Sequence, residues 1–134
     1  MEVRTILRSI AALLAGYAVV VVVTSVAFPL VLGHPLVRKD DPREVLLGTI
    51  IAVIAGLAGG WVATLAGVLR PVANATLVTI PIALETTLVL WLRTPRDEIV
   101  FSAAGAIILM GSAVAAGFLR ELFSRRHRSA PGAA

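Results

Sequence analysis

The class of this protein is decided by residues 45–69, VLLGTIIAVIAGLAGGWVATLAGVL. This stretch carries no charged residue and is longer than the about 20 apolar residues that a helix needs to cross a bilayer. A helix pairs its own backbone N–H and C=O groups, as the bilayer core requires. We therefore predict a transmembrane helix over these residues.

Three further apolar segments flank this one, and together they define the fold class. The chain has 134 residues, of which 58% are hydrophobic and 15% are charged, and its mean hydropathy is +0.94. Such a composition excludes an ordinary soluble domain. We predict an all-α membrane protein, a four-span transmembrane helix bundle, with spans over about 6–32, 45–69, 72–92 and 99–119.

The chain divides into a membrane domain and a short basic tail. Residues 1–124 hold the four spans, and residues 125–134 have no apolar periodicity, so we expect disorder there beyond a frayed helix end. The first span has features of a signal peptide, because Arg4 and Arg8 precede it and Ser25-Val26-Ala27 resembles a cleavage site. Its apolar run continues through Leu32, which favours a retained span.

The orientation follows from basic residues near the ends of the spans. Both termini and the turn at residues 70–71 share one side, which carries seven basic residues: Arg4, Arg8, Arg70, Arg120, Arg125, Arg126 and Arg128. The other side carries five: Arg38, Lys39, Arg43, Arg93 and Arg96. The excess predicts that both termini lie in the cytoplasm.

Two similar motifs suggest that the fold consists of two tandem helical hairpins. Residues 41–44 read DPRE before the second span, and residues 94–97 read TPRD before the fourth. Each predicts a helix start, with Asp41 or Thr94 as N-cap and proline at the first helical position. Any helix start favours these residue types, so a duplication and a coincidence both stay open.

Small residues at helical spacing predict close helix packing. The second span has a stripe of Gly56, Gly60, Ala63 and Gly67, and the fourth has Gly111 with Ala115 and Ser112 with Ala116. We expect these faces to pack within the bundle, and packing against another subunit is the alternative. Trp61 is expected to pack near the middle of its span, and Trp91 to lie at the membrane interface.

Glu85 is the one acid or base well inside a span. A charge there is costly, so Glu85 is either protonated or faces water. Pro81 removes one N–H and predicts a kink one turn before Glu85. We expect Thr24 and Ser25 of the first span to be its partners by depth, with Thr86 beside it.

Other chemistry is sparse in this sequence. His34 and His127 have no second ligand at metal spacing, so we expect both to be solvated and no metal or cofactor to bind. No cysteine is present, and no basic and aromatic pattern supports nucleic-acid binding. We expect the bilayer to be the main partner, with anionic lipid head groups held by Arg125, Arg126 and Arg128.

Two segments resemble spans of small uncharacterised bacterial four-helix membrane proteins. They are LRSIAALLAGYAVVVVVTS at 7–25 and AGLAGGWVATLAG at 55–67, with Gly59-Gly60-Trp61 as a glycine-pair-aromatic motif. The resemblance covers the first half of the chain and implies the fold and an inner-membrane location. The favoured function is a non-enzymatic accessory or structural subunit, in a homo- or hetero-oligomer. The alternative is a small transporter or channel that uses Glu85.

Overall fold

The computed structural model describes residues 2–129 and 132 of the chain. It is all-helical over these residues, with α1 (Val3–Leu32), α2 (Pro42–Ala66), α3 (Pro71–Leu77), α4 (Thr79–Leu92) and α5 (Ile99–Ser129). The ranges Val3–Leu32, Pro42–Ala66, Pro71–Leu92 and Ile99–Ser129 are each long and apolar enough to cross a membrane. The predicted fold class is confirmed.

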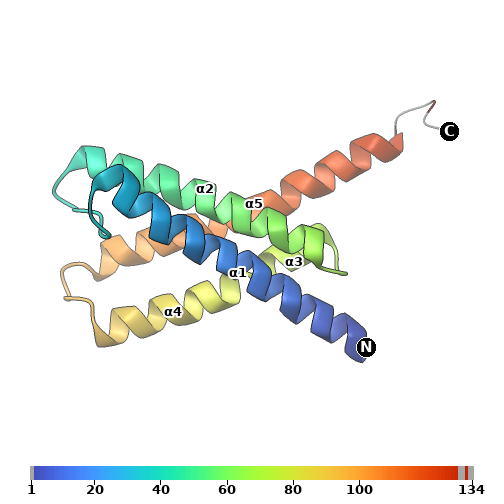
Figure 1. The fold of residues 1–134 in the computed structure, drawn as a ribbon, viewed down its shortest axis with the longest axis horizontal. Helices are drawn as coiled ribbons and strands as arrows, with labels where there is room; N and C mark the ends of the chain where they lie inside the picture. The colour runs from blue at the N-terminus through green and yellow to red at the C-terminus, as the bar shows by residue number, and fades with distance from the viewer. Residues whose placement is uncertain (1, 130–131, 133–134) are drawn as a thin grey trace.

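Helix α2 lies at the centre of the bundle, as Figure 1 shows. It packs along α1 on one side and along α5 on the other, while α4 packs against α5 and stands apart from α2. The chain ends near residues 3 and 129 lie at one end of the molecule. The α1–α2 and α4–α5 loops lie together at the other end, where the Lys39 ammonium contacts the Asp97 carboxylate at 2.9 Å.

Glycines let α2 approach both of its neighbours. A Cβ added at Gly56 or Gly60 would collide with the backbone carbonyls of Leu109 or Ala113 on α5. On the α1 side, a Cβ at Gly59 would lie 2.7 Å from the Gly16 carbonyl oxygen. Lipid supplies no hydrophobic drive between helices, so this close contact is what holds the bundle together.

The predicted stripe of small residues on α2 does pack within the bundle. On α5, the prediction that Gly111 and Ala115 pack there is wrong. Ala63 is fully buried, and Gly56 and Gly60 face α5. On α5, however, Gly111 and Ala115 are exposed, and a Cβ at Gly111 would meet no atom within 4 Å. The face in contact is rotated by one residue and consists of Ser112, Ala113, Ala116 and Gly117.

Gly67 and Asn74 close the turn between α2 and α3. Gly67 is the C-cap of α2, and a Cβ there would collide with the side chain of Asn74. Asn74 is fully buried, and its Nδ2 donates to the Leu69 carbonyl at 2.8 Å. Asn74 was not among the predicted site residues, although a buried amide in a span needs such a partner.

Only one of the two predicted N-caps forms. The Asp41 carboxylate accepts from the Arg43 N–H at 2.9 Å, and Pro42 begins α2. The Thr94 prediction is wrong: α5 begins at Ile99, and the Thr94 hydroxyl donates to the Val89 carbonyl at 3.2 Å. The Thr94 side chain therefore bonds to the last turn of α4. Residues 94–98 do not form a capped helix start like the one at Asp41.

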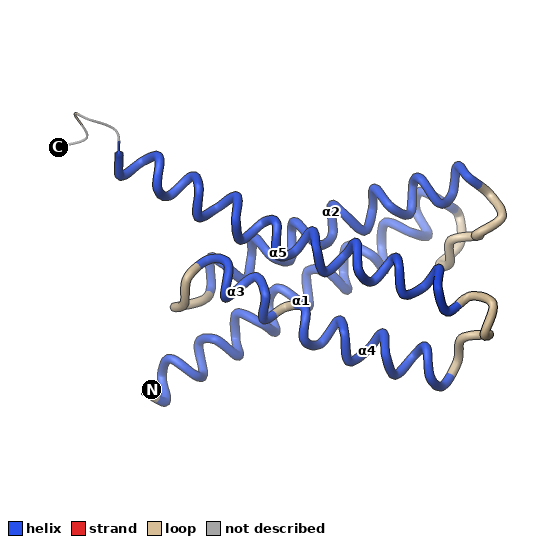
Figure 2. The backbone as a smooth tube through the Cα atoms, turned by 180° about the vertical axis from the view of Figure 1, so that it is seen from behind, coloured by secondary structure: helices blue, strands red, loops and turns tan. Residues whose placement is uncertain are grey.

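The third span is broken, which agrees with the predicted kink. α3 ends at Leu77, and α4 begins at Thr79, two residues before Pro81 (Figure 2). Proline has no N–H for the i−4 carbonyl and its ring crowds that carbonyl, here of Leu77. The break redirects α4 away from α2.

The tail prediction is partly wrong. α5 continues as a regular helix to Ser129, so residues 125–129 are ordered within it. Arginines 126 and 128 lie in its last turn, where positive charge complements the helix dipole. The remainder of the tail lies outside the described residues, except for Gly132.

Candidate functional site

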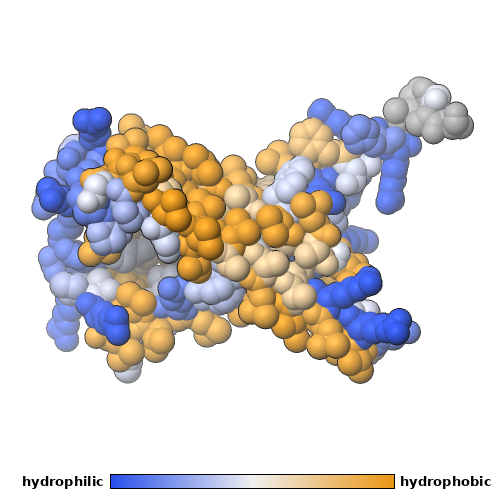
Figure 3. Space-filling model, viewed as in Figure 1, coloured by the Kyte–Doolittle hydropathy of each residue, from blue (hydrophilic) through white to orange (hydrophobic). Residues whose placement is uncertain are grey.

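A cavity of about 920 Å³ lies among α1, α2, α4 and α5, at the end of the molecule that carries the two loops. It exists because α4 leans away from α2 after the break in the third span. Figure 3 shows the hollow from one side, with hydrophilic residues between apolar surfaces. Its walls are mainly apolar, with hydroxyl groups of Thr24, Ser25, Thr49, Thr86 and Ser102.

Glu85 supplies the carboxylate of this cavity within the membrane spans. It lies on α4, six residues before Trp91, which is about 9 Å along a helix. Trp91 is 87% exposed at the loop end, and its position at the membrane interface stays a prediction. Glu85 is exposed and lines the cavity, so the carboxylate faces the hollow.

The hydrogen-bond partner of Glu85 is Tyr17 of α1. The Tyr17 hydroxyl donates to the Glu85 Oε2 atom, and this bond joins α1 to α4 across the cavity. Tyr17 was not among the predicted partners of Glu85. A signal was present, because Tyr17 is the chain's single tyrosine and lies inside an apolar run, and a phenol in such a place needs a polar partner.

The predicted partners Thr24 and Ser25 do not bond to Glu85. The Thr24 hydroxyl donates to the Val20 and Val21 carbonyls of its own helix, at 2.8 and 3.1 Å. This local bond is a common alternative for threonine in helices and removes the need for a partner across the cavity. Both residues nevertheless line the same cavity as Glu85 and Thr86.

Pro81 acts on the site through the backbone. It is absent from the residues that line the cavity, and it lies about one turn before Glu85 on α4. Since the break near Pro81 sets the direction of α4, it also sets where the Glu85 carboxylate lies.

Charged residues from the loops surround the outer part of the cavity: Arg38, Lys39, Asp40 and Glu98. Lys39 lies 2.9 Å from the Asp97 Oδ2 atom and 3.8 Å from the Glu98 Oε1 atom, which ties the two loops together. The hydrogen bond from Lys39 lowers the pKa of Asp97, and the bond to Asp97 raises the pKa of Lys39.

His34 differs from the expectation that it is solvated. Its Nε2 atom lies 3.0 Å from the Glu44 carboxylate, and the same carboxylate accepts from the Arg38 N–H at 2.9 Å. These contacts fix the loop after α1 against the start of α2. Among the described residues, no group of three or more His, Cys, Asp or Glu side chains could hold a metal ion.

The predicted lipid arginines lie on the exposed last turns of α5. Arg125 forms an ion pair with Glu121 at 2.7 Å, one helical turn earlier. Arg126 and Arg128 are exposed. The predicted contact with lipid head groups stays a prediction for all three.

No family model, no curated protein and no solved structure matches this chain.

Proposed function

We propose that this protein is a small, non-enzymatic membrane transporter that binds a cationic solute in the cavity at Glu85. The observation that supports this is the exposure of an intramembrane carboxylate to a cavity at the loop end of the bundle. Ionisable residues inside membrane spans commonly serve substrate or ion pathways.

The chemistry of the cavity favours an amphipathic organic cation with one positive charge. A volume of about 920 Å³ lies at the upper end of the range of small-molecule sites. The walls are mainly apolar, and Glu85 is the one acid deep in the cavity, so the solute would bring apolar groups and a single balancing charge.

Tyr17 would position the carboxylate for this role. Its hydroxyl occupies Oε2, and no residue in the described part of the chain donates to Oε1. One oxygen is thus held by α1 while the other is available to a cation or a proton. Binding at Oε1 would connect occupancy of the cavity with the contact between α1 and α4.

The test is cation binding to the purified protein in detergent, with tetraphenylphosphonium as the probe, followed by uptake into liposomes. Glu85→Gln keeps the size of the side chain and cannot ionise, so it should reduce binding at least about tenfold, because the cation loses the carboxylate that balances its charge. The matched control is Glu121→Gln. It removes a carboxylate near the C-terminal end of α5, away from the cavity, and should leave binding unchanged. Equal binding by the wild type and Glu85→Gln would refute the proposal.

A second candidate function, a subunit of a larger membrane complex, is favoured by a different observation. Gly111 and Ala115 form a small-residue pair on the exposed face of α5, and a Cβ added at Gly111 would meet no atom within 4 Å. Such pairs commonly pack against another helix. The mass of the detergent-solubilised particle distinguishes the two, since a stable hetero-complex supports the subunit function.

The proposed location is a bacterial inner membrane with both termini in the cytoplasm. It is supported by the seven basic residues on the side of the termini against five on the loop side. Reporter fusions after Ala134 should then report the cytoplasm, and fusions near Lys39 should report the outside. A periplasmic signal from Ala134 would reverse the orientation.

A further inference from the structure

We propose that the groove between α2 and α5 beside Trp61 and Arg120 binds one anionic phospholipid. The groove has a volume of about 460 Å³ and its walls are almost entirely apolar: Leu57, Ala58, Trp61, Val62, Ala116 and Leu119. It is separate from the cavity at Glu85, so this proposal stands independently of the proposed function.

Arg120 is held in place at this groove by two contacts with α2. Its Nη1 atom donates to the Thr64 hydroxyl at 2.9 Å, and its guanidinium carbon lies 5.7 Å from the centre of the Trp61 ring. The Thr64 hydroxyl in turn donates to the Trp61 carbonyl at 2.6 Å, and Thr64 is only 6% exposed. The guanidinium is therefore fixed before any ligand arrives.

No carboxylate balances the charge of Arg120 within residues 2–129. The neighbouring Glu121 is paired with Arg125 at 2.7 Å. A guanidinium has five N–H donors, and one of them is used for Thr64. The remaining donors suit the paired oxygens of a phosphate group, which guanidinium binds in a bidentate manner.

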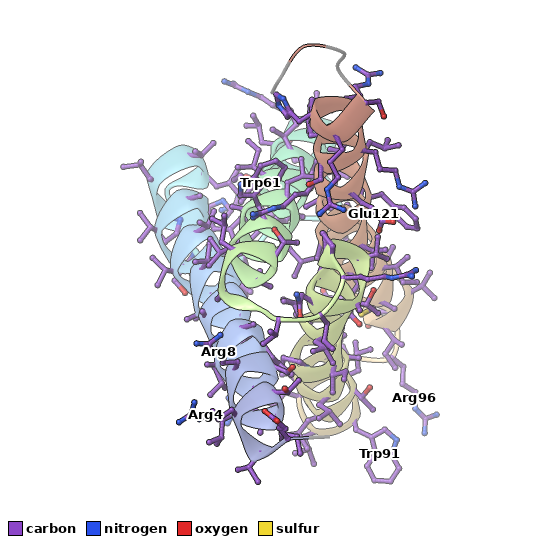
Figure 4. All side chains as sticks on the ribbon, turned by 90° about the vertical axis from the view of Figure 1, so that its right-hand side faces the viewer. Arg4, Arg8, Trp61, Trp91, Arg96 and Glu121 are labelled. Carbon is purple, nitrogen blue, oxygen red and sulfur yellow. The ribbon has the colours of Figure 1, made fainter. Side chains whose placement is uncertain are left out.

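The site lies near the end of α2, where the head group of a lipid would lie. Trp61 lies five residues before Ala66, the last residue of α2, which is about 8 Å along a helix. The expectation that Trp61 packs near the middle of its span is therefore wrong; it is 38% exposed near the end of the helix, a usual position for interfacial tryptophan. In Figure 4, Trp61 lies beside the helix that carries Glu121, and Trp91 projects from another side of the bundle.

A phospholipid fits both parts of this site at once. Its phosphate would meet Arg120, and an acyl chain would lie along the apolar groove toward Leu57. Basic pockets between transmembrane helices hold anionic head groups in this way. A free phosphate ion would satisfy Arg120 but would leave the groove unused.

The test uses the fluorescence of Trp61. The chain has two tryptophans, so Trp91→Phe leaves Trp61 as the single reporter. The protein is reconstituted in phosphatidylcholine with brominated phosphatidylglycerol or brominated phosphatidylcholine as quencher. We expect the anionic quencher to act at about fivefold lower mole fraction, the preference that one basic residue near the surface provides.

Two variants in the Trp91→Phe background separate the charge from the groove. Arg120→Gln should remove the preference for the anionic lipid, whereas the control Arg125→Gln, one and a half turns further along α5, should retain it. Ala58→Leu fills the groove without changing the charge and should weaken quenching by both lipids. Circular dichroism and the Trp61 emission maximum confirm that each variant is folded.

Three results would overturn the proposal. Equal quenching of the wild-type site by both lipids removes the head-group preference. An unchanged preference in Arg120→Gln assigns it to other basic residues. Displacement of the brominated lipid by soluble glycerol phosphate makes the site one for free phosphate.

Discussion

Single residues decide whether helices of this protein touch. At Gly60 the backbone of α2 contacts the backbone of α5, and there is no room for a methyl group against the Ala113 carbonyl. At Gly111, which lies on α5, a methyl group would meet nothing within 4 Å. The two glycines look alike in the sequence, and only one is required by packing.

This contrast gives the first prediction. Gly60→Ala should lower the free energy of unfolding by about 1–3 kcal/mol, because α2 and α5 must separate to admit the methyl group. Gly111→Ala should be neutral or stabilising by up to about 1 kcal/mol, because alanine favours the helix. Unfolding in mixed detergent–SDS micelles, followed by circular dichroism, measures both. Equal effects of the two substitutions would contradict the packing described here.

The hydrogen bond between Tyr17 and Glu85 gives a second prediction at this scale. Tyr17→Phe removes the hydroxyl and keeps the ring, so it should lower the free energy of unfolding by about 0.6 kcal/mol, a typical value for a side-chain hydrogen bond in a membrane. The matched control is Thr24→Val, whose hydroxyl bonds within its own helix. An unchanged free energy of unfolding in Tyr17→Phe would contradict a stabilising bond between Tyr17 and Glu85.

Elements of the fold are set by their ends and their interruptions. Pro42 and Asp41 start α2, Pro71 starts α3, and the break before Pro81 separates α3 from α4. The break turns α4 outward and opens the cavity that contains Glu85. The resemblance between residues 41–44 and 94–97 does not extend to the helix starts, because the Thr94 hydroxyl bonds to Val89.

The third prediction compares the two expected caps. Asp41→Ala should lower the free energy of unfolding by about 1 kcal/mol, since the Arg43 N–H loses its acceptor. Thr94→Ala should change it by no more than about 0.5 kcal/mol, because the bond from its hydroxyl to the Val89 carbonyl is exposed. Chemical denaturation of both variants measures the difference. If Thr94→Ala costs as much as Asp41→Ala, the fourth span has a cap that this structure lacks.

At the scale of the whole molecule, the α1–α2 and α4–α5 loops contact each other at the outer edge of the cavity. Lys39 connects the α1–α2 loop with Asp97 and Glu98 of the α4–α5 loop. The bond to Lys39 lowers the pKa of Asp97. The bond is therefore fully present above the ordinary aspartate pKa of 3.8, and it is lost as the pH falls through the lowered pKa. Lys39 is raised in pKa, so the bond is also lost as the pH rises through that raised value, above 10.5.

The fourth prediction follows from this window. The loops should stay together near neutral pH and separate only as the pH falls below the ordinary aspartate pKa of 3.8, because the bond to Lys39 lowers the pKa of Asp97. The chain has no cysteine, so nitroxide labels at cysteines introduced at Pro35 and Arg93 report the distance between the loops. In Lys39→Gln the distance should be larger at neutral pH and should not depend on acid. A pH-dependent distance in Lys39→Gln would assign the change to other groups.

The sequence by itself determined the four spans, the cap at Asp41 and the interruption near Pro81. These depend on local quantities: the length of an uncharged run, a side chain beside its own backbone, and a missing N–H. Glu85 was found for the same reason, since a carboxylate in an apolar run is visible without any partner.

Tertiary structure alone decided the partner of Glu85, the cavity that it faces, and the contact face of α5. Tyr17 and Glu85 are far apart in the chain and meet because the fold places α1 and α4 on opposite sides of one cavity, where their side chains bond across it. Ser112 and Ala116 rather than Gly111 and Ala115 lie toward the bundle because α5 is rotated by one residue, about 100°. Both small pairs have the same spacing, so only the relative rotation of two packed helices distinguishes them.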